Sequence, residues 1–161
     1  IALQGEALYA GFYVLELLTR LLRERQQEPH VFQSARRVLE VLEEDDPLQP
    51  ALRRFELELL DQLGYGIDFS VDGEGLRDSA FYWFEPQVGF HLVNRDTGPV
   101  RSVSGKVLQA IARRDFADPV ALDAAKLLMR AALPSGAPSG APSCTTLLIE
   151  DFRMDAVFLA A

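Results

Sequence analysis

The basic side chains between residues 101 and 130 are the part of this sequence best suited to binding an anion. This stretch holds six bases and three acids, although the whole chain of 161 residues has a formal net charge of −8. Contacts from Lys and Arg to phosphate supply most of the non-specific affinity of proteins for nucleic acids. The acidic total therefore argues against a dedicated, high-affinity duplex binder, whereas the uneven distribution permits a local basic face. The candidate phosphate-binding residues are Arg101, Lys106, Arg113, Arg114, Lys126 and Arg130.

Arg113 and Arg114 also permit a purely structural interpretation. They follow a segment of helical periodicity, and cations at the end of a helix can interact with its last carbonyl groups. The residues alone leave phosphate binding and helix capping equally open at these two positions.

A second pair of arginines lies in the most acidic part of the chain. Residues 40–78 hold twelve acids and three bases, and Arg53 and Arg54 are two of those bases. On a helix they can pair with Glu56 and Glu58, about one turn away. The residues alone favour this solvated ion-pair interpretation over a ligand site.

Side chains for catalysis or metal binding are sparse. His30 and His91 lie far apart, and neither has a Cys or His at metal-ligand spacing. The single cysteine, Cys144, has no obvious activating base near it in sequence. The glycines at 64 and 66 follow a helix and lack the lysine of a phosphate loop. We therefore predict no catalytic residue, no metal and no cofactor.

The aromatic run 81–84, Phe-Tyr-Trp-Phe, permits two interpretations. It could stack nucleic-acid bases, or its alternate residues could pack a hairpin against helices. Because few basic residues lie near it, packing is favoured.

The elements that must position these residues are mostly helices. Apolar residues recur at three- and four-residue spacing over 8–25, 31–44, 49–63, 104–113 and from 118 to about 132. Residues 80–84 and 90–94 read as a short β-hairpin, and residues 72–75 read as a turn. The predicted fold class is mainly α, a bundle-like domain of about five helices with a small inserted β-hairpin.

Details of these helices give sharper predictions. The inward stripe of the first helix is predicted to be Leu8, Phe12, Leu15, Leu18 and Leu22. Gly64 is predicted to cap the end of the third helix. Asp118 followed by Pro119 is a specific start signal for the last helix.

The composition changes after residue 133. Residues 134–143 repeat Pro-Ser-Gly-Ala and are predicted to form a linker, and residues 144–161 are predicted to form an apolar tail. No apolar stretch approaches the roughly 18 residues that suggest a membrane span. A lone cysteine fits a reducing cytosol, so we predict a cytoplasmic protein. The start at Ile1 suggests part of a longer chain.

Four segments, in order, carry a family resemblance. Residues 52–66 read LRRFELELLDQLGYG, and residues 8–18 read LYAGFYVLELL. Ser-Gly at 104–105 opens a helix, and residues 124–130 read AAKLLMR. These segments resemble the C-terminal helical part of the RecO family, bacterial recombination mediators, over residues 3–133.

The resemblance implies a non-enzymatic role in DNA repair. Family members carry an oligonucleotide-binding barrel, which would precede Ile1 here, and bind single- and double-stranded DNA. They act with RecR and RecF and help RecA to replace the single-strand-binding protein SSB, so nucleoid association is expected. The family's helical domain also receives the acidic, apolar C-terminal tail of SSB.

The resemblance also implies a site for that tail. A terminal carboxylate and neighbouring acids require arginine, which binds carboxylates bidentately, and a terminal Phe requires an apolar pocket. By matching positions this role falls first on Arg53 and Phe69, then on Arg54 and Leu57. The same resemblance favours DNA contact by the six basic residues of the 101–130 stretch.

The sequence departs from the family in two places. The zinc-binding cysteines that some members have are missing around 70–90, and the segment after residue 133 differs from the usual family pattern. Two other functions stay open: a structural scaffold that holds the barrel and RecR without direct ligand binding, and a hydrolase that uses Cys144 or a carboxylate pair.

Overall fold

The computed structural model describes residues 1–22, 28–44, 47–95, 98–99 and 101–133. These residues form five helices and five short strands, so the predicted fold class is confirmed. The helices are α1 (Gly5–Leu21), α2 (Pro29–Glu43), α3 (Leu48–Gln62), α4 (Gly105–Ala112) and α5 (Pro119–Ala132). Among the described residues, none of the helices has the length and apolar character needed to cross a membrane. The predicted linker and tail, with Cys144, lie outside the described residues.

The strands form two small antiparallel sheets. β3 (Phe81–Glu85) pairs with β4 (Gly89–Val93), as the predicted hairpin required, and also with β5 (Val103–Ser104). The second sheet pairs β1 (Ser70–Val71) with β2 (Glu74–Gly75). The turn between β1 and β2 is Asp72-Gly73, and both residues have positive φ, 53° and 79°. Two positive φ angles are typical of the tight turn that joins antiparallel strands. The predicted turn at 72–75 is therefore the centre of a two-stranded ribbon.

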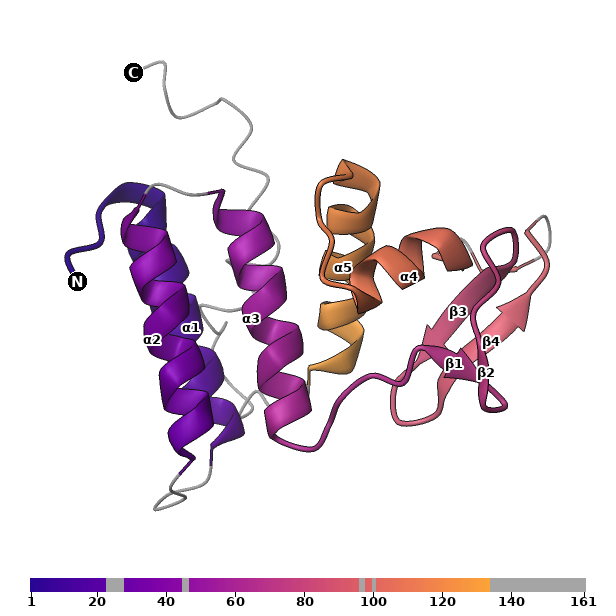
Figure 1. The fold of residues 1–161 in the computed structure, drawn as a ribbon, viewed down its shortest axis with the longest axis horizontal. Helices are drawn as coiled ribbons and strands as arrows, with labels where there is room; N and C mark the ends of the chain where they lie inside the picture. Colours follow the sequence, from indigo (N-terminus) through magenta and orange to yellow (C-terminus); the bar gives the residue numbers. More distant parts are fainter. Residues whose placement is uncertain (23–27, 45–46, 96–97, 100, 134–161) are drawn as a thin grey trace, which may run out of the picture.

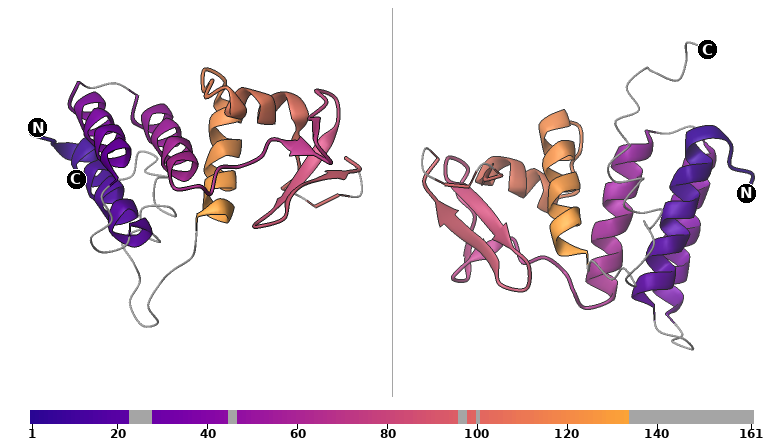
Figure 2. Two further views of the ribbon diagram at one scale, coloured as in Figure 1. Left: turned by 60° about the horizontal axis from the view of Figure 1, so that its bottom comes forward. Right: turned by 180° about the vertical axis from the view of Figure 1, so that it is seen from behind.

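Helix α3 is the centre of the molecule (Figures 1 and 2). It lies between the α1–α2 pair on one side and α5 with the sheets on the other. Its residues Leu52, Phe55 and Leu59 join a first core with α1 and α2. Leu57 and Leu60 join a second core with α4, α5 and the strands. Because α3 buries two faces, some of the polar residues between these apolar positions are buried as well.

The predicted inward stripe of α1 is wrong for three of its five members. Leu8, Phe12 and Leu15 are 40 %, 52 % and 52 % exposed. The buried face carries Ala10, Gly11, Tyr13, Val14 and Leu17 instead. The helix is apolar on more than one face, and the small residues at 10 and 11 allow close approach: a Cβ added at Gly11 would lie 2.5 Å from the Leu3 side chain, closer than real Cβ contacts allow. Leu18 and Leu22 do pack against the first core.

Both predicted helix caps are confirmed. The Asp118 carboxylate accepts a hydrogen bond from the Val120 amide at 2.9 Å. Gly64 has φ +79°, and the amide that follows it, on Tyr65, donates to the Leu60 carbonyl. A glycine in this conformation satisfies the last carbonyls of a helix without steric cost. The chain can therefore leave α3 towards the sheets.

Candidate anion-binding cluster on α3 and α5

Charged side chains from α3 and α5 face one another where the two helices pack. The pKa of Lys126 on α5 is lowered, first by partial burial and then by the positive charges of Arg130 and Arg53. Asp123 and Glu56 oppose this shift. Arg53 comes from α3 and Arg130 lies one turn after Lys126, so two helices direct three cations to one place. We name Arg53, Lys126 and Arg130 the α3–α5 cluster.

Arg53 is held inside the molecule by a buried network. Its side chain is 8 % exposed and forms an ion pair with Glu56 at 2.8 Å, one turn along α3. The hydroxyl of Tyr13, from α1, donates to the same carboxylate oxygen of Glu56. The expected pairing of Arg53 with Glu56 is present, at i,i+3 spacing, but the expectation of a solvated pair is wrong, because both side chains are buried between two cores.

Part of this network lacks partners. Arg53 Nε and Glu56 Oε2 are buried and have no hydrogen-bond partner in the structure described above. Burial raises the pKa of Glu56, against the opposing effects of Arg53, Tyr13 and Lys126. Burial also raises the pKa of Tyr13. Arg53 therefore contributes its charge from inside the molecule. Lys126 is partly exposed and Arg130 is exposed, so these two cations can meet an incoming carboxylate or phosphate oxygen.

The other residues expected to bind the SSB tail differ in environment. Arg54 is exposed, and its Nε donates to the Arg114 carbonyl at 3.4 Å. Leu57 is buried in the second core. Phe69 packs against that core partly buried, with its ring 5.5 Å from the ring of Phe90. The structure thus puts one arginine inside and one outside, with both apolar residues in the second core.

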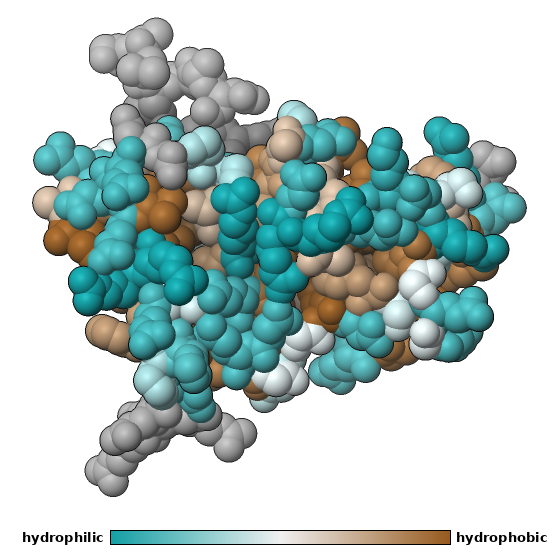
Figure 3. Space-filling model, viewed as in Figure 1, coloured by the Kyte–Doolittle hydropathy of each residue, from teal (hydrophilic) through white to brown (hydrophobic). Residues whose placement is uncertain are grey.

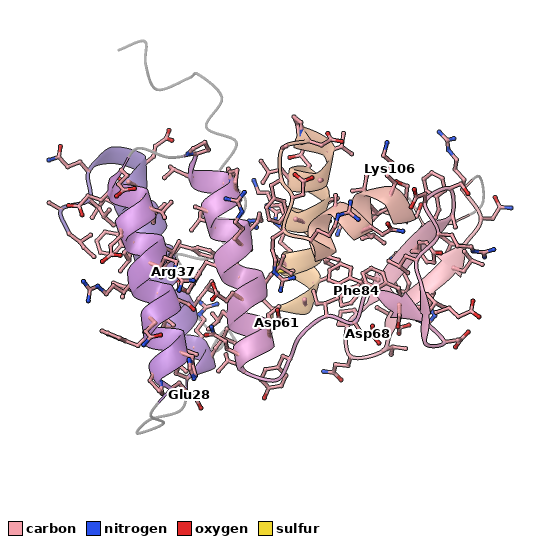
Figure 4. All side chains as sticks on the ribbon, viewed as in Figure 1. Glu28, Arg37, Asp61, Asp68, Phe84 and Lys106 are labelled. Atoms are coloured by element: carbon pink, nitrogen blue, oxygen red, sulfur yellow. The ribbon has the colours of Figure 1, made fainter. Side chains whose placement is uncertain are left out.

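The basic residues on α4 do not form one cluster. Lys106 begins α4 on the side of the sheets, far from Asp61 on α3 (Figure 4). Arg113 follows the helix and is exposed. Arg114, in contrast, forms an ion pair with Asp61 and donates to the Ala112 carbonyl at 2.7 Å. The carbonyl-capping interpretation therefore fits Arg114, which fastens the α4–α5 connection to α3, whereas Arg113 is accessible.

The comparisons with known proteins decide the family. The family model described as "Recombination protein O C terminal" matches residues 2–127. The chain belongs to the RecO C-terminal family. Curated relatives named "DNA repair protein RecO" include those of Pseudomonas aeruginosa and Cellvibrio japonicus, which are 39 % and 38 % identical over 133 residues. That of Erwinia tasmaniensis is 39 % identical over 137 residues.

These relatives are considerably longer than the matched region. The matches cover 81 %, 81 % and 83 % of this chain but 56 %, 56 % and 55 % of the relatives, in the order given. The chain therefore spans about half the length of the curated RecO proteins it matches. The predicted family resemblance over residues 3–133 is confirmed.

The sequence reasoning named Glu56 as a possible partner of Arg53 but missed Tyr13 and the burial of this network in the RecO domain. A signal for the burial was present in the spacing of apolar residues on α3. Leu52 and Phe55 form one apolar face, and Leu57 and Leu60 form another. Arg53 and Glu56 lie between these faces and are buried, whereas Arg54 is exposed. A buried arginine requires a carboxylate or another acceptor.

Proposed function

We propose that this domain serves DNA repair and recombination by binding the acidic C-terminal tail of SSB at the α3–α5 cluster. The relatives' name, DNA repair protein RecO, supports the general role. The convergence of Arg53, Lys126 and Arg130 from two packed helices is the single observation that carries the site.

The physical argument begins with repulsion among these cations. Partial burial lowers the pKa of Lys126, and the positive charges of Arg130 and Arg53 lower it further, so the three cations lie close enough for repulsion. A peptide carboxylate bound at the α3–α5 cluster, on the partly exposed Lys126 and the exposed Arg130, replaces this repulsion with attraction. In such a partly buried site, a hydrogen bond between two charged groups contributes about 1.5–3 kcal/mol.

The apolar part of the tail needs a neighbouring hydrophobic surface. Leu57 and Phe69 belong to the second core, which α5 shares with α3. Arg54 lies on the exposed side of α3 and is available to acids further from the end of the tail. Of these residues, Phe69 is partly buried and can offer apolar surface, whereas Leu57 is 2 % exposed and supports that surface from the core.

A second part of the proposal is DNA contact by the exposed bases. Arg101, Lys106 and Arg113 are exposed, and Lys126 and Arg130 extend positive charge along α5. We include RecR and RecF as partners and RecA loading as the outcome, in the cytoplasm and at the nucleoid. These finer roles come from the family resemblance.

A titration with an SSB-tail peptide measures how much the α3–α5 cluster contributes to binding. Lys126→Gln should weaken binding about tenfold, because it removes a charge-assisted contact. Arg130→Ala should have a smaller effect, about two- to fivefold, because the side chain is exposed. Arg36→Ala is the matched control, since Arg36 is exposed on α2 and pairs with Glu40. Equal affinities for all four proteins would contradict the proposal.

Arg53 needs a different design. Arg53→Ala alone would leave Glu56 buried without its cation, so lost binding and lost folding would be confused. The double variant Arg53→Leu with Glu56→Leu removes both charges and keeps apolar volume, so its fold should persist. We expect this variant to fold and to lose tail binding.

The salt dependence of DNA binding tests the exposed bases. Each phosphate contact contributes about one unit to the slope of log affinity against log salt. Arg113→Ala should reduce the slope by about one. Arg114→Ala should leave it unchanged, because Arg114 already pairs with Asp61. A slope that changes only in the Arg114 variant would reverse this assignment.

The alternative function is a structural scaffold without direct ligand binding. The internal partners of Arg53 and Arg114 favour it, because both guanidinium groups stabilise the fold itself. The absence of saturable binding by the SSB-tail peptide would support this alternative.

A further inference from the structure

Helix α1 is apolar on the side that faces away from the first core as well as on the side that packs into it. The residues of its buried face are Ala10, Tyr13, Val14 and Leu17. Four further residues recur at three- and four-residue spacing on the opposite side, and all four are exposed. We name Leu8, Phe12, Leu15 and Thr19 the outer stripe of α1.

The outer stripe belongs to no core cluster of the described residues and has no role in the proposed function. In the right-hand view of Figure 2, α1 (indigo) lies at the front of the molecule, and Figure 3 shows hydrophobic residues at the surface where α1 and α2 lie. A helix that is hydrophobic on all sides is usually buried. An exposed apolar surface of this kind marks an interaction site.

The polar groups beside the stripe indicate an apolar, uncharged occupant. Residues 7–15 carry no charge. The Thr19 hydroxyl donates to the Leu15 carbonyl at 2.8 Å, so the threonine methyl group can be covered without leaving the hydroxyl unpaired. Glu16 and Arg20, next to the stripe, already form an ion pair with each other at 2.6 Å. Neither a phosphate nor an acidic peptide would find a free cation here.

The spacing of the stripe makes it complementary to itself. Steps of four, three and four residues are those of the seam between two paired helices. Leu8 and Leu15 lie at equal distances from a point between residues 11 and 12. Two antiparallel copies of α1 related by a two-fold axis at that point would place Leu8 beside Leu15 of the other copy, with the two Phe12 rings adjacent.

The size of the surface predicts a weak association. Leu8, Phe12 and Leu15, with Tyr9 beside them, are between 40 % and 57 % exposed. A fully covered aromatic side chain buries about 150–250 Å², so these four offer roughly 400 Å² per copy. With their polar rim, two facing copies would bury about 1,000 Å², the lower limit for a specific interface. The expected dissociation constant is on the order of 100 µM.

We propose that two copies of this chain associate through the outer stripes of their α1 helices, packed antiparallel. The inference is independent of the proposed function, because the stripe contains no residue of the α3–α5 cluster. It assigns the exposed face of α1 to a second copy of the same chain.

Sedimentation velocity of the full chain tests the association. The mean mass should rise from monomer towards dimer between concentrations about tenfold below and about tenfold above the expected dissociation constant. Phe12→Glu should abolish this rise, because it places two negative charges at the two-fold axis. Val88→Glu is the matched control, since Val88 is an exposed apolar residue in the β3–β4 turn, and it should associate like the wild type. Circular dichroism should show a native fold for both variants.

Salt should act in the opposite direction from its effect on DNA binding. The net charge of −8 makes the copies repel each other, and added salt screens that repulsion. The dimer should therefore strengthen as salt is added, whereas contacts to phosphate weaken. Loss of the dimer in high salt would indicate an ionic interface and overturn the proposal.

Disulfide cross-linking tests the antiparallel arrangement. In a Cys144→Ser background, Phe12→Cys should form a disulfide-linked dimer. Leu8→Cys and Leu15→Cys should each stay monomeric alone but cross-link when mixed. Seven residues along a helix separate two like positions by about 10 Å, which exceeds the Cα separation of roughly 4.4–6.8 Å that a disulfide allows.

Three results would overturn the proposal. The first is a wild-type protein that stays monomeric over the whole concentration range, and the second is a dimer that Phe12→Glu leaves intact. The third is an intrachain disulfide between Cys144 and Phe12→Cys in the chain that keeps Cys144, which would assign the outer stripe to this chain's own C-terminal segment. The SSB-tail titration is unaffected by any of them, since Phe12 lies outside the α3–α5 cluster.

Discussion

The two halves of the molecule share α3 but use it differently. The first core joins α1, α2 and one face of α3 and consists of helical residues, mostly aliphatic. The second core joins the other face of α3 to α4, α5 and the strands, and contains aromatic residues such as Tyr82, Phe90 and Phe116. The candidate sites for the SSB tail and for DNA lie on the second half or at its border with the first. Helices that pack regularly bury their surfaces, whereas a sheet set against helices leaves hollows where small residues face large ones.

The border between the halves holds the buried ion pair. Glu56 is fully buried, and it accepts a hydrogen bond from Tyr13 of the first core. Its partner Arg53 influences Lys126 in the second half. The network therefore connects the two halves by electrostatic interactions as well as by packing. Variants of the shared residues test this connection.

The largest expected effects come from the two adjacent leucines of α3. Leu59 is fully buried in the first core and Leu60 is 1 % exposed in the second. Changing either to Ala should destabilise the protein by about 3–5 kcal/mol, because it removes buried methyl groups and leaves a cavity. Because α3 is shared, both variants should unfold in one transition.

Circular dichroism and Trp83 fluorescence together check this cooperativity, since Trp83 reports only on the second half. If Leu59→Ala melted helices while Trp83 kept its native signal, the halves would be independent folding units. In that case α3 would not couple the folding of the two cores.

The next effect concerns the buried pair. Arg53→Met leaves Glu56 buried without its cation, which should cost about 3 kcal/mol at neutral pH. The double variant Arg53→Met with Glu56→Leu should recover most of that loss, because no charge remains to be buried. Urea denaturation of the single and double variants measures both values. Equal stability of the two variants would show that Glu56 tolerates isolation.

The pH dependence of Glu56 is a further test. Burial raises its pKa in the folded protein above the ordinary glutamate value of about 4.5, so the folded state binds the proton more tightly than the unfolded state. This contribution to stability is fully present below about pH 4.5 and is lost as pH rises through the folded-state pKa. Relative to Glu56→Gln, the wild type should therefore become less stable as pH rises over that interval. A constant difference between the two proteins would contradict the assignment.

The helices of this fold could be predicted from sequence because their signals are local. The cap at Asp118, the glycine at 64 and the hairpin of β3 and β4 depend on neighbours within a few residues. The short strands β1 and β5 could not, since two residues carry too little pattern to distinguish a strand from a turn.

The site was less predictable because it depends on which faces are buried. Arg53 occurs in a recognisable family motif, but its pairing with Glu56 and Tyr13 requires α3 to be enclosed on two sides. The hollow between β3 and α5 depends on Ala124 meeting aromatic residues about forty positions earlier in the chain. The local periodicity of the sequence does not predict that contact.

The smallest expected effect tests the corrected face of α1. Phe12 is 52 % exposed, whereas Val14, two positions later, is fully buried in the first core. Phe12→Ala should change stability by less than about 0.5 kcal/mol, as is usual for surface positions. Val14→Ala should cost roughly 1–3 kcal/mol, because it deletes buried methyl groups. Thermal denaturation of the two variants ranks them directly. A larger loss in Phe12→Ala would restore the stripe that the sequence pattern predicted, and would mean that α1 packs on the first core through its other face.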